Sequence, residues 1–306
     1  MKLTYNSILF FFLLMLSCKN HDSEYIKVIA DLPKSLNECS GIENLKGSRN
    51  FWVINDSGNT NELFEVTPKG KILRVVEVVN ARNKDWEDLA SNGSDQLFIG
   101  DFGNNNNKRK DLTIYWVNTN LIKNNKIATT KTNFYFEDQE RFPPKKKDRN
   151  FDVEAFVYKD GYFYLFTKNR SSKFDGPTKL YQVLAQEGEQ KAVLTDVFVT
   201  CQDQSDCLIT SATLSKDKNE LVLLTHNKLF QFRDFKEANF FDGIIKEIPL
   251  HHKTQKEAIC FKSRELFIAD EATKSEGGNL ISHHFLKVLA ILRVLIHCIE
   301  RLVAFL

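Results

Sequence analysis

The sequence predicts an all-β fold, a β-propeller built from a repeated four-stranded unit. Three observations predict it: a motif that recurs at blade-sized intervals, an apolar strand after each copy, and further strands in which polar and apolar residues alternate. The composition agrees, because 25 phenylalanines in 306 residues favour strands and a packed core. A chain of this length is compatible with one such domain.

The recurring motif is an acid or serine, then a small or acidic residue, then an apolar one. Its copies begin 47, 67, 57 and 46 residues apart, and units of about 40–50 residues with loop insertions are typical of propeller blades. We expect each copy to form the innermost strand of a blade. The copies lie at residues 40–42, 87–89, 154–156, 211–213 and 257–259.

Further strands follow each copy of the motif. A second strand that ends in polar residues is expected at 51–56, 97–101, 163–169, 221–226 and 266–271. A third strand alternates with period 2, which is typical of a strand with one buried face, at 63–66, 113–117, 179–183 and 229–232. Fourth strands are expected in most units, for example at 71–79, 132–136 and 192–199.

The fifth unit breaks off after residues 277–280, where its third strand is expected. A strand-like run at residues 25–32 precedes the first unit, and we expect it to be the outer strand of the last blade, which closes the ring and protects its edge. The sequence therefore predicts a five-bladed propeller over residues 25–282. The alternative is a sixth blade within the long second interval, around residues 118–147.

Both ends of the chain depart from the strand pattern. Residues 1–17 have the positive start and short apolar run of a signal peptide, and Ser17–Cys18 resembles the end of a lipobox. Residues 18–24 are then a tether from a lipidated Cys18, with a non-lipidated secretory peptide as the alternative. Residues 283–306 show helical apolar spacing. This tail could lie on a membrane surface, pack on the propeller, or be an aberrant or accessory end, which we favour.

Composition narrows the partners and the compartment. A net charge of +2 argues against a nucleic-acid partner, and an exported chain reaches an oxidising compartment in which disulfides form. Cys201 and Cys207 are close enough in sequence to clip a loop. We therefore expect a disulfide between them. Lipidated Cys18 would anchor the chain to the membrane of a bacterial cell envelope, at the outer membrane or cell surface.

Several motifs resemble a known family. ECSGI at 38–42, FWVINDSG at 51–58 and LFEV at 63–66 resemble the opening of the SdiA-regulated propeller proteins. DWEDLA at 85–90, followed by IGDFGNN at 99–105, is similar to related bacterial propeller lipoproteins. The resemblance covers residues 25–280 and implies a propeller, but no activity. More distantly, calcium-dependent lactonases and esterase-like phytases share the scaffold and carry acids at the channel mouth.

The repeat predicts where polar side chains gather. The inner strand of a blade begins at the face where the second strand ends, so Glu87, Glu154 and Glu257 are expected to converge on one mouth of the channel. The polar ends of the second strands should ring that mouth: Asp56, Asp101, Asn169, His226 and Asp270.

Carboxylates crowded together without Lys or Arg repel one another unless some are protonated or a hard cation neutralises them. Ca²⁺ takes about six to eight oxygen ligands and suits such a ring. We therefore predict a Ca²⁺ site at the mouth, with candidate ligands Glu87, Glu154, Glu257, Asp56, Asp101 and Asp270. The alternative is that these side chains line a water-filled channel.

Three functions fit this pattern. The first is a membrane-anchored binding or scaffold propeller with an unidentified ligand or protein partner at its mouth. The second is a metal-dependent hydrolase of lactones, esters or phosphoesters, in which Glu154 or Asp101 would act as the base. A protein-interaction module without metal is a third. Nucleophile-elbow, phosphate-loop and HExxH motifs are absent from the sequence.

Overall fold

The structure is a computed structural model, and it describes residues 26–284. The expected signal peptide, Cys18 with its tether, and the tail from residue 285 onward lie outside the described residues. Within the described part, strands dominate and helices are limited to single turns.

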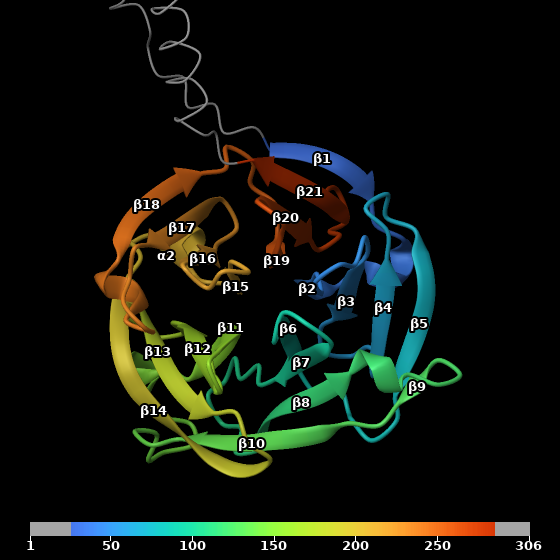
Figure 1. Cartoon of the computed structure of the whole chain (residues 1–306). Coiled ribbons are helices and arrows are strands. Elements are labelled where there is room, and N and C mark those ends of the chain that lie inside the picture. Colours follow the sequence, from blue (N-terminus) through green and yellow to red (C-terminus); the bar gives the residue numbers. More distant parts are fainter. Residues whose placement is uncertain (1–25, 285–306) are drawn as a thin grey trace, which may run out of the picture. The chain divides into compact units, whose positions relative to one another are not determined.

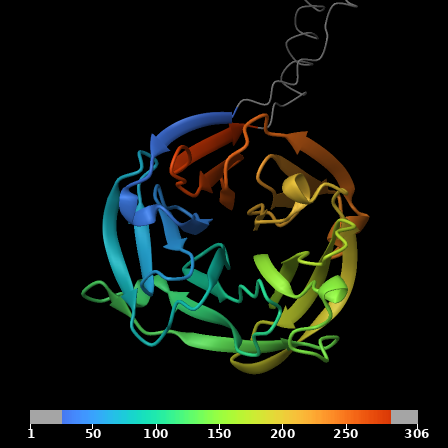
Figure 2. The same cartoon turned by 180° about the vertical axis from the view of Figure 1, so that it is seen from behind.

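Twenty of the strands form antiparallel units of four, arranged radially about a central axis (Figure 1), and Figure 2 shows the same ring from behind. From the centre outward, the first unit is β2 (Cys39–Glu43), β3 (Phe51–Asn55), β4 (Glu62–Val66) and β5 (Ile72–Val78). The second is β6 (Trp86–Ser91), β7 (Gln96–Asp101), β8 (Leu112–Asn118) and β10 (Thr130–Phe136). The third is β11 (Asp152–Lys159), β12 (Tyr162–Lys168), β13 (Pro177–Leu184) and β14 (Gly188–Val199).

The fourth unit is β15 (Ser211–Leu214), β16 (Glu220–Leu224), β17 (Lys228–Arg233) and β18 (Ile244–Pro249). The last is β19 (Lys256–Lys262), β20 (Glu265–Asp270), β21 (Asn279–His284) and, outermost, β1 (Ile26–Asp31). This radial arrangement of four-stranded sheets is a β-propeller, as predicted. Each copy of the repeated motif lies on an innermost strand.

The first and last strands of the described chain close the ring. β1 pairs antiparallel with β21, from Ile26 opposite His283 to Asp31 opposite Asn279. The N-terminal strand thus supplies the outer strand of the last unit. One expectation is corrected: the third strand of that unit is present, and it runs two residues past the boundary we placed at residue 282. The six residues of this strand, NLISHH, alternate too little to be recognised beside the helical spacing that follows.

The long second interval contains connections between units. It holds η2 (Thr119–Leu121), the two-residue strand β9 (Lys126–Ile127), β10 and a loop with η3 (Lys146–Asp148). β9 pairs in parallel with β5, and β10 pairs in parallel with β14, so that the second and third units share one eight-stranded sheet. Within residues 118–151 of the described chain, no further four-stranded unit appears.

Aromatic side chains fill the space between neighbouring units. Phe98 and Phe102 of the second unit pack against Phe156 and Phe163 of the third, with ring centroids 4.9 Å (Phe98–Phe163) and 5.2 Å (Phe102–Phe156) apart. All four rings are buried. Such edge-on pairs stabilise a core beyond the area they bury.

The remaining short elements lie in loops: η1 (Lys34–Leu36), α2 (Gln204–Cys207) and η4 (Phe240–Asp242). Asp203 caps α2 by accepting a hydrogen bond from the Ser205 N–H, 2.9 Å away. A disulfide joins Cys201 to Cys207 and closes this loop. It is the pair expected from the sequence.

Candidate functional site

A cavity of about 170 Å³ opens where the inner strands begin. Side chains from four of the five units line it, and every one of them is polar or charged. They are Ser40, Asp56, Glu87, Asn105, Glu154, Lys168, Arg170, Gln255, Glu257 and Glu271. The structure therefore brings together Glu87, Glu154, Glu257 and Asp56, four of the six expected ligands.

A β-bulge aims the inner-strand residues into this cavity. In β2, β6, β11 and β19 the pairing with the next strand skips one residue, and the skipped residues are Ser40, Glu87, Glu154 and Glu257. A bulge leaves its extra residue out of the ladder and redirects the side chain, and bulges often lie beside functional sites. The first position of the repeated motif is thus the bulge position in these four units.

Three carboxylates form the tightest acidic group of the described chain. Oxygen atoms of Asp56, Asp85 and Glu87 all lie within 4.8 Å of one another. Asp56 follows β3, while Asp85 and Glu87 lie at the start of β6. Gly103 makes this approach possible, because a Cβ atom there would overlap Glu87 Oε1 and come within 2.5 Å of Asp85 Oδ2. We call Asp56, Asp85 and Glu87 the acidic triad.

Within the acidic triad, the carboxylate of Glu87 has the fewest groups that could compensate its negative charge. Its side chain is 92% buried, since only 8% is exposed, and among the described residues it has no hydrogen-bond or ion-pair partner. Burial, and then the charges of Glu154, Asp56 and Asp85, raise its pKa well above the usual value. Burial also raises the pKa of Asp56, to about 6, helped by neighbouring acids and opposed by the Ser57 N–H.

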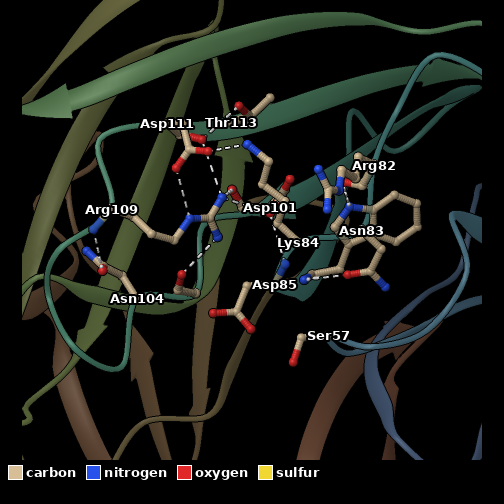
Figure 3. A network of polar contacts seen from close by, with 12 residues as sticks. Ser57, Arg82, Asn83, Lys84, Asp85, Asp101, Asn104, Arg109, Asp111 and Thr113 are labelled. Atoms are coloured by element: carbon tan, nitrogen blue, oxygen red, sulfur yellow. Dashed lines mark hydrogen bonds and ion pairs between the residues drawn. The ribbon is translucent and has the colours of Figure 1, made fainter.

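The backbone and loop around Asp85 are held firmly in place. Its N–H donates to Asp101 Oδ1 over 3.1 Å, and its carbonyl accepts from the Gly103 N–H over 3.2 Å. In Figure 3 the Asp85 carboxylate lies near Ser57 and apart from the dashed network around Arg109. Burial raises the pKa of Asp85, and the nearby charge of Arg109 opposes this rise.

The negative charge of Glu154 is compensated by two neighbouring cations, unlike the charges of the acidic triad. Lys168 Nζ lies 2.9 Å from its Oε2 and Arg170 Nη2 lies 2.7 Å from its Oε1. Arg170 Nε also reaches Asp152 Oδ2, 2.5 Å away. Burial alone would raise the pKa of Glu154, but the two cations lower it below its usual value. The expectation of acids crowded without Lys or Arg is thus corrected on this side of the cavity, and Glu154 is poorly suited to act as a base.

Asp101 and Asp270 do not line the cavity, contrary to expectation. Asp101 is 1% exposed and pairs with Arg109 Nη2 over 3.0 Å. Asp270 is fully buried and accepts a hydrogen bond from the Asn279 N–H over 2.6 Å. Both side chains end a second strand but do not reach the cavity. Asp101 is neutralised by Arg109, whereas Asp270 Oδ2 has no hydrogen-bond partner among the described residues. Asp101 is therefore not placed to act as a base on a ligand in the cavity.

The other two expected rim residues have specific partners. His226 Nε2 lies 2.9 Å from Glu257 Oε1, at the edge of the cavity. Asn169 turns away and donates from Nδ2 to Asp175 Oδ1 over 3.3 Å. Lys256, which precedes Glu257 in the sequence, is buried and donates to the carbonyl oxygens of His226 and His252.

Sequence reasoning missed four charged residues of this site: Asp85, Lys168, Arg170 and Glu271. Asp85 stands two positions before the motif, and Glu271 follows the polar end of β20. Lys168 and Arg170 are two residues apart at the end of β12, so the period of a strand could place both on one side. Applying that period past the strand ends would have found the two cations.

Comparisons with known proteins support the fold. No protein-family model and no curated protein matches the sequence. Among solved structures, the chain is similar to aldose sugar dehydrogenase from Streptomyces coelicolor in its PQQ-bound form, with a TM-score of 0.50, 8% identity, and coverage of 85% of this chain and 98% of that one. This similarity shows the propeller fold alone.

Two further similarities are weaker. A Bacteroides thetaiotaomicron protein of unknown function gives a TM-score of 0.47 at 10% identity, covering 85% of this chain and 75% of that one. A chain of a nidogen–laminin complex gives 0.43 at 10% identity, covering 76% and 72%. Membership of the SdiA-regulated family stays a prediction. In residues 26–284, no helix has the length and apolar character needed to cross a membrane.

Proposed function

We propose that this chain is an exported, five-bladed propeller, anchored through Cys18 to the bacterial cell envelope, that binds Ca²⁺ and a small polar ligand in its mouth cavity. The observation that carries the cation site is the buried, unpartnered carboxylate of Glu87 beside Asp56 and Asp85. Five four-stranded units with a strand-closed edge support the blade number.

The geometry of the acidic triad suits a hard divalent cation. Two oxygens bound to one Ca²⁺ at about 2.4 Å lie at most about 4.8 Å apart, and the triad oxygens lie within that limit. Ca²⁺ accepts flexible carboxylate geometry, and water supplies the remaining ligands. A bound cation would also remove the repulsion that raises the pKa of Glu87.

The test is Ca²⁺ titration of the chelator-treated mature protein, followed by calorimetry and thermal melting. Ca²⁺ at about 100 times its Kd stabilises the folded state by about 2.7 kcal/mol, which corresponds to roughly 5–10 °C in a domain of this size. We expect Glu87→Gln to weaken binding at least about tenfold. Glu247→Gln is the matched control, because Glu247 is exposed on the outer strand β18.

Two results would contradict the cation site. The first is a melting temperature that neither Ca²⁺ nor Mg²⁺ changes in the unaltered protein. The second is Ca²⁺ binding that Glu87→Gln leaves as tight as Glu247→Gln does. The anchor is tested separately: Cys18→Ser should move the protein from the membrane fraction to the soluble fraction of the envelope, and unchanged membrane association would refute lipid attachment there.

A further inference from the structure

Beyond the acidic triad, the cavity has one wall that offers hydrogen-bond donors. Lys168 is 93% buried, since 7% is exposed, and it lines the cavity. Its ammonium group has three N–H donors, and among the described residues it has one acceptor, Glu154 Oε2. Arg170 bonds through Nε and Nη2, and its Nη1 has no acceptor in the same part of the chain.

The last unit supplies a second wall, which offers acceptors. Glu257 uses Oε1 to contact His226, and Glu271 uses Oε2 to accept from Gln255 Nε2, 2.9 Å away. The other oxygen of each carboxylate has no hydrogen-bond donor among the described residues. Burial, and then the charges of Glu257 and Asp56, raise the pKa of Glu271 to about 8. A positive group bound beside this carboxyl would favour its ionised form.

These two walls together select a class of ligand. A simple anion would meet the donors of Lys168 and Arg170 but would face Glu257 and Glu271. A simple amine would satisfy the acidic wall and leave the buried donors without acceptors, which is costly. A molecule that carries both groups satisfies both walls and adds no net charge.

We propose that the mouth cavity binds a small zwitterion, an amino acid in the chemical sense, with its carboxylate on Lys168 and Arg170 and its ammonium group on Glu257 and Glu271. This inference rests on the proposed cation-binding mouth, because the ligand lies in the same cavity. The cavity has a volume of about 170 Å³, which suits a small amino acid.

The experiment is calorimetric titration of the Ca²⁺-loaded mature protein with five probes. Glycine, β-alanine and 4-aminobutyrate are zwitterions with increasing separation of charge, while methylammonium and acetate carry one charge each. We expect at least one zwitterion to bind about tenfold or more tightly than either single-charge probe, which is about 1.4 kcal/mol.

Two variants test the contribution of each wall to ligand binding separately. Glu271→Gln should weaken the zwitterion and methylammonium at least about tenfold, and it should not weaken acetate, because the change removes a carboxylate that repels an anion. The double variant Lys168→Met/Glu154→Gln removes the buried pair together, so no unpaired charge remains, and it should weaken the zwitterion and acetate but not methylammonium. Ca²⁺ affinity and the melting temperature are measured on each variant.

The outcomes distinguish this inference from the cation site. Ca²⁺ binding without any zwitterion preferred over the single-charge probes would overturn the inference and leave the cation site standing. Preference for acetate, or for methylammonium, would overturn it in the same way. Zwitterion binding that both variants weaken, in a protein that binds no Ca²⁺, would support the ligand class and overturn the cation site alone.

Discussion

Replacing Asp88 with asparagine tests how the inner strands are held together. Asp88 is fully buried on β6, and its carboxylate accepts four hydrogen bonds. Oδ1 accepts from the Leu89 N–H over 2.9 Å and the Ser211 hydroxyl over 3.0 Å. Oδ2 accepts from the N–H groups of Phe156 and Ala212 over 3.1 and 3.4 Å. One side chain therefore joins three units of the ring.

Asparagine keeps the shape of this side chain but replaces one acceptor oxygen with a donor NH₂. All four neighbours donate to Asp88, and of these only the Ser211 hydroxyl can turn to accept. One or two buried N–H groups are thus left without partners, at about 1–3 kcal/mol each. We expect Asp88→Asn to lower the free energy of unfolding by about 2–4 kcal/mol, or roughly 4–16 °C in melting temperature.

The assay is urea unfolding at neutral pH, followed by tryptophan fluorescence and circular dichroism. Asp242→Asn is the control, because Asp242 is exposed and the same chemical change there should cost less than about 0.5 kcal/mol. If Asp88→Asn unfolds at the same urea concentration as this control, the bridging role assigned to Asp88 is refuted.

Three further predictions concern the cavity and the disulfide loop. Without Ca²⁺, the pKa values of Asp56 (about 6) and Glu271 (about 8) lie above their ordinary values, so the folded state binds more protons than the unfolded state. The free energy of unfolding should therefore fall as pH rises from about 4 to 8. A melting temperature that rises over this range in the presence of chelator would contradict this. Gly103→Ala should weaken Ca²⁺ binding in a calorimetric titration, because the added methyl would displace Glu87 Oε1 and the Asp85 carboxylate; unchanged affinity would refute the geometry. Cys201→Ser opens a loop with a sequence separation of 6 and should cost about 2 kcal/mol in urea unfolding, and reduction of the unaltered protein should cost the same.

The strand pattern is the part of this molecule that could be predicted from sequence. Each innermost strand carries the repeated motif, and the ring closes through β1, because period-2 alternation and repeat length are local properties that the chain shows directly. Where the local pattern was short, as in β21, the prediction failed. The joining of the second and third units into one sheet was also not predicted, since the local sequence of β10 or of β14 does not indicate that these two strands pair in parallel.

The candidate site was predicted in outline, and its pairings were not. The motif places an acid at the same bulge in β6, β11 and β19, so convergence of Glu87, Glu154 and Glu257 follows from the repeat. What these acids do depends on distances through space. Glu154 meets two cations from β12 and the loop after it, whereas Glu87 meets only other acids, although the two occupy equivalent positions in the repeat.

By itself, then, the sequence determined a propeller and the inner-strand acids that face its mouth, because the alternation of apolar and polar residues and the length of the repeat are local features of the sequence. Only the tertiary structure decided which acid is neutralised and which is left free. Asp101 is turned into its loop by Arg109, while Asp85, two residues before the motif, takes its place beside Glu87. Charge compensation acts between residues that are distant in sequence and adjacent in space, and sequence spacing does not report that adjacency.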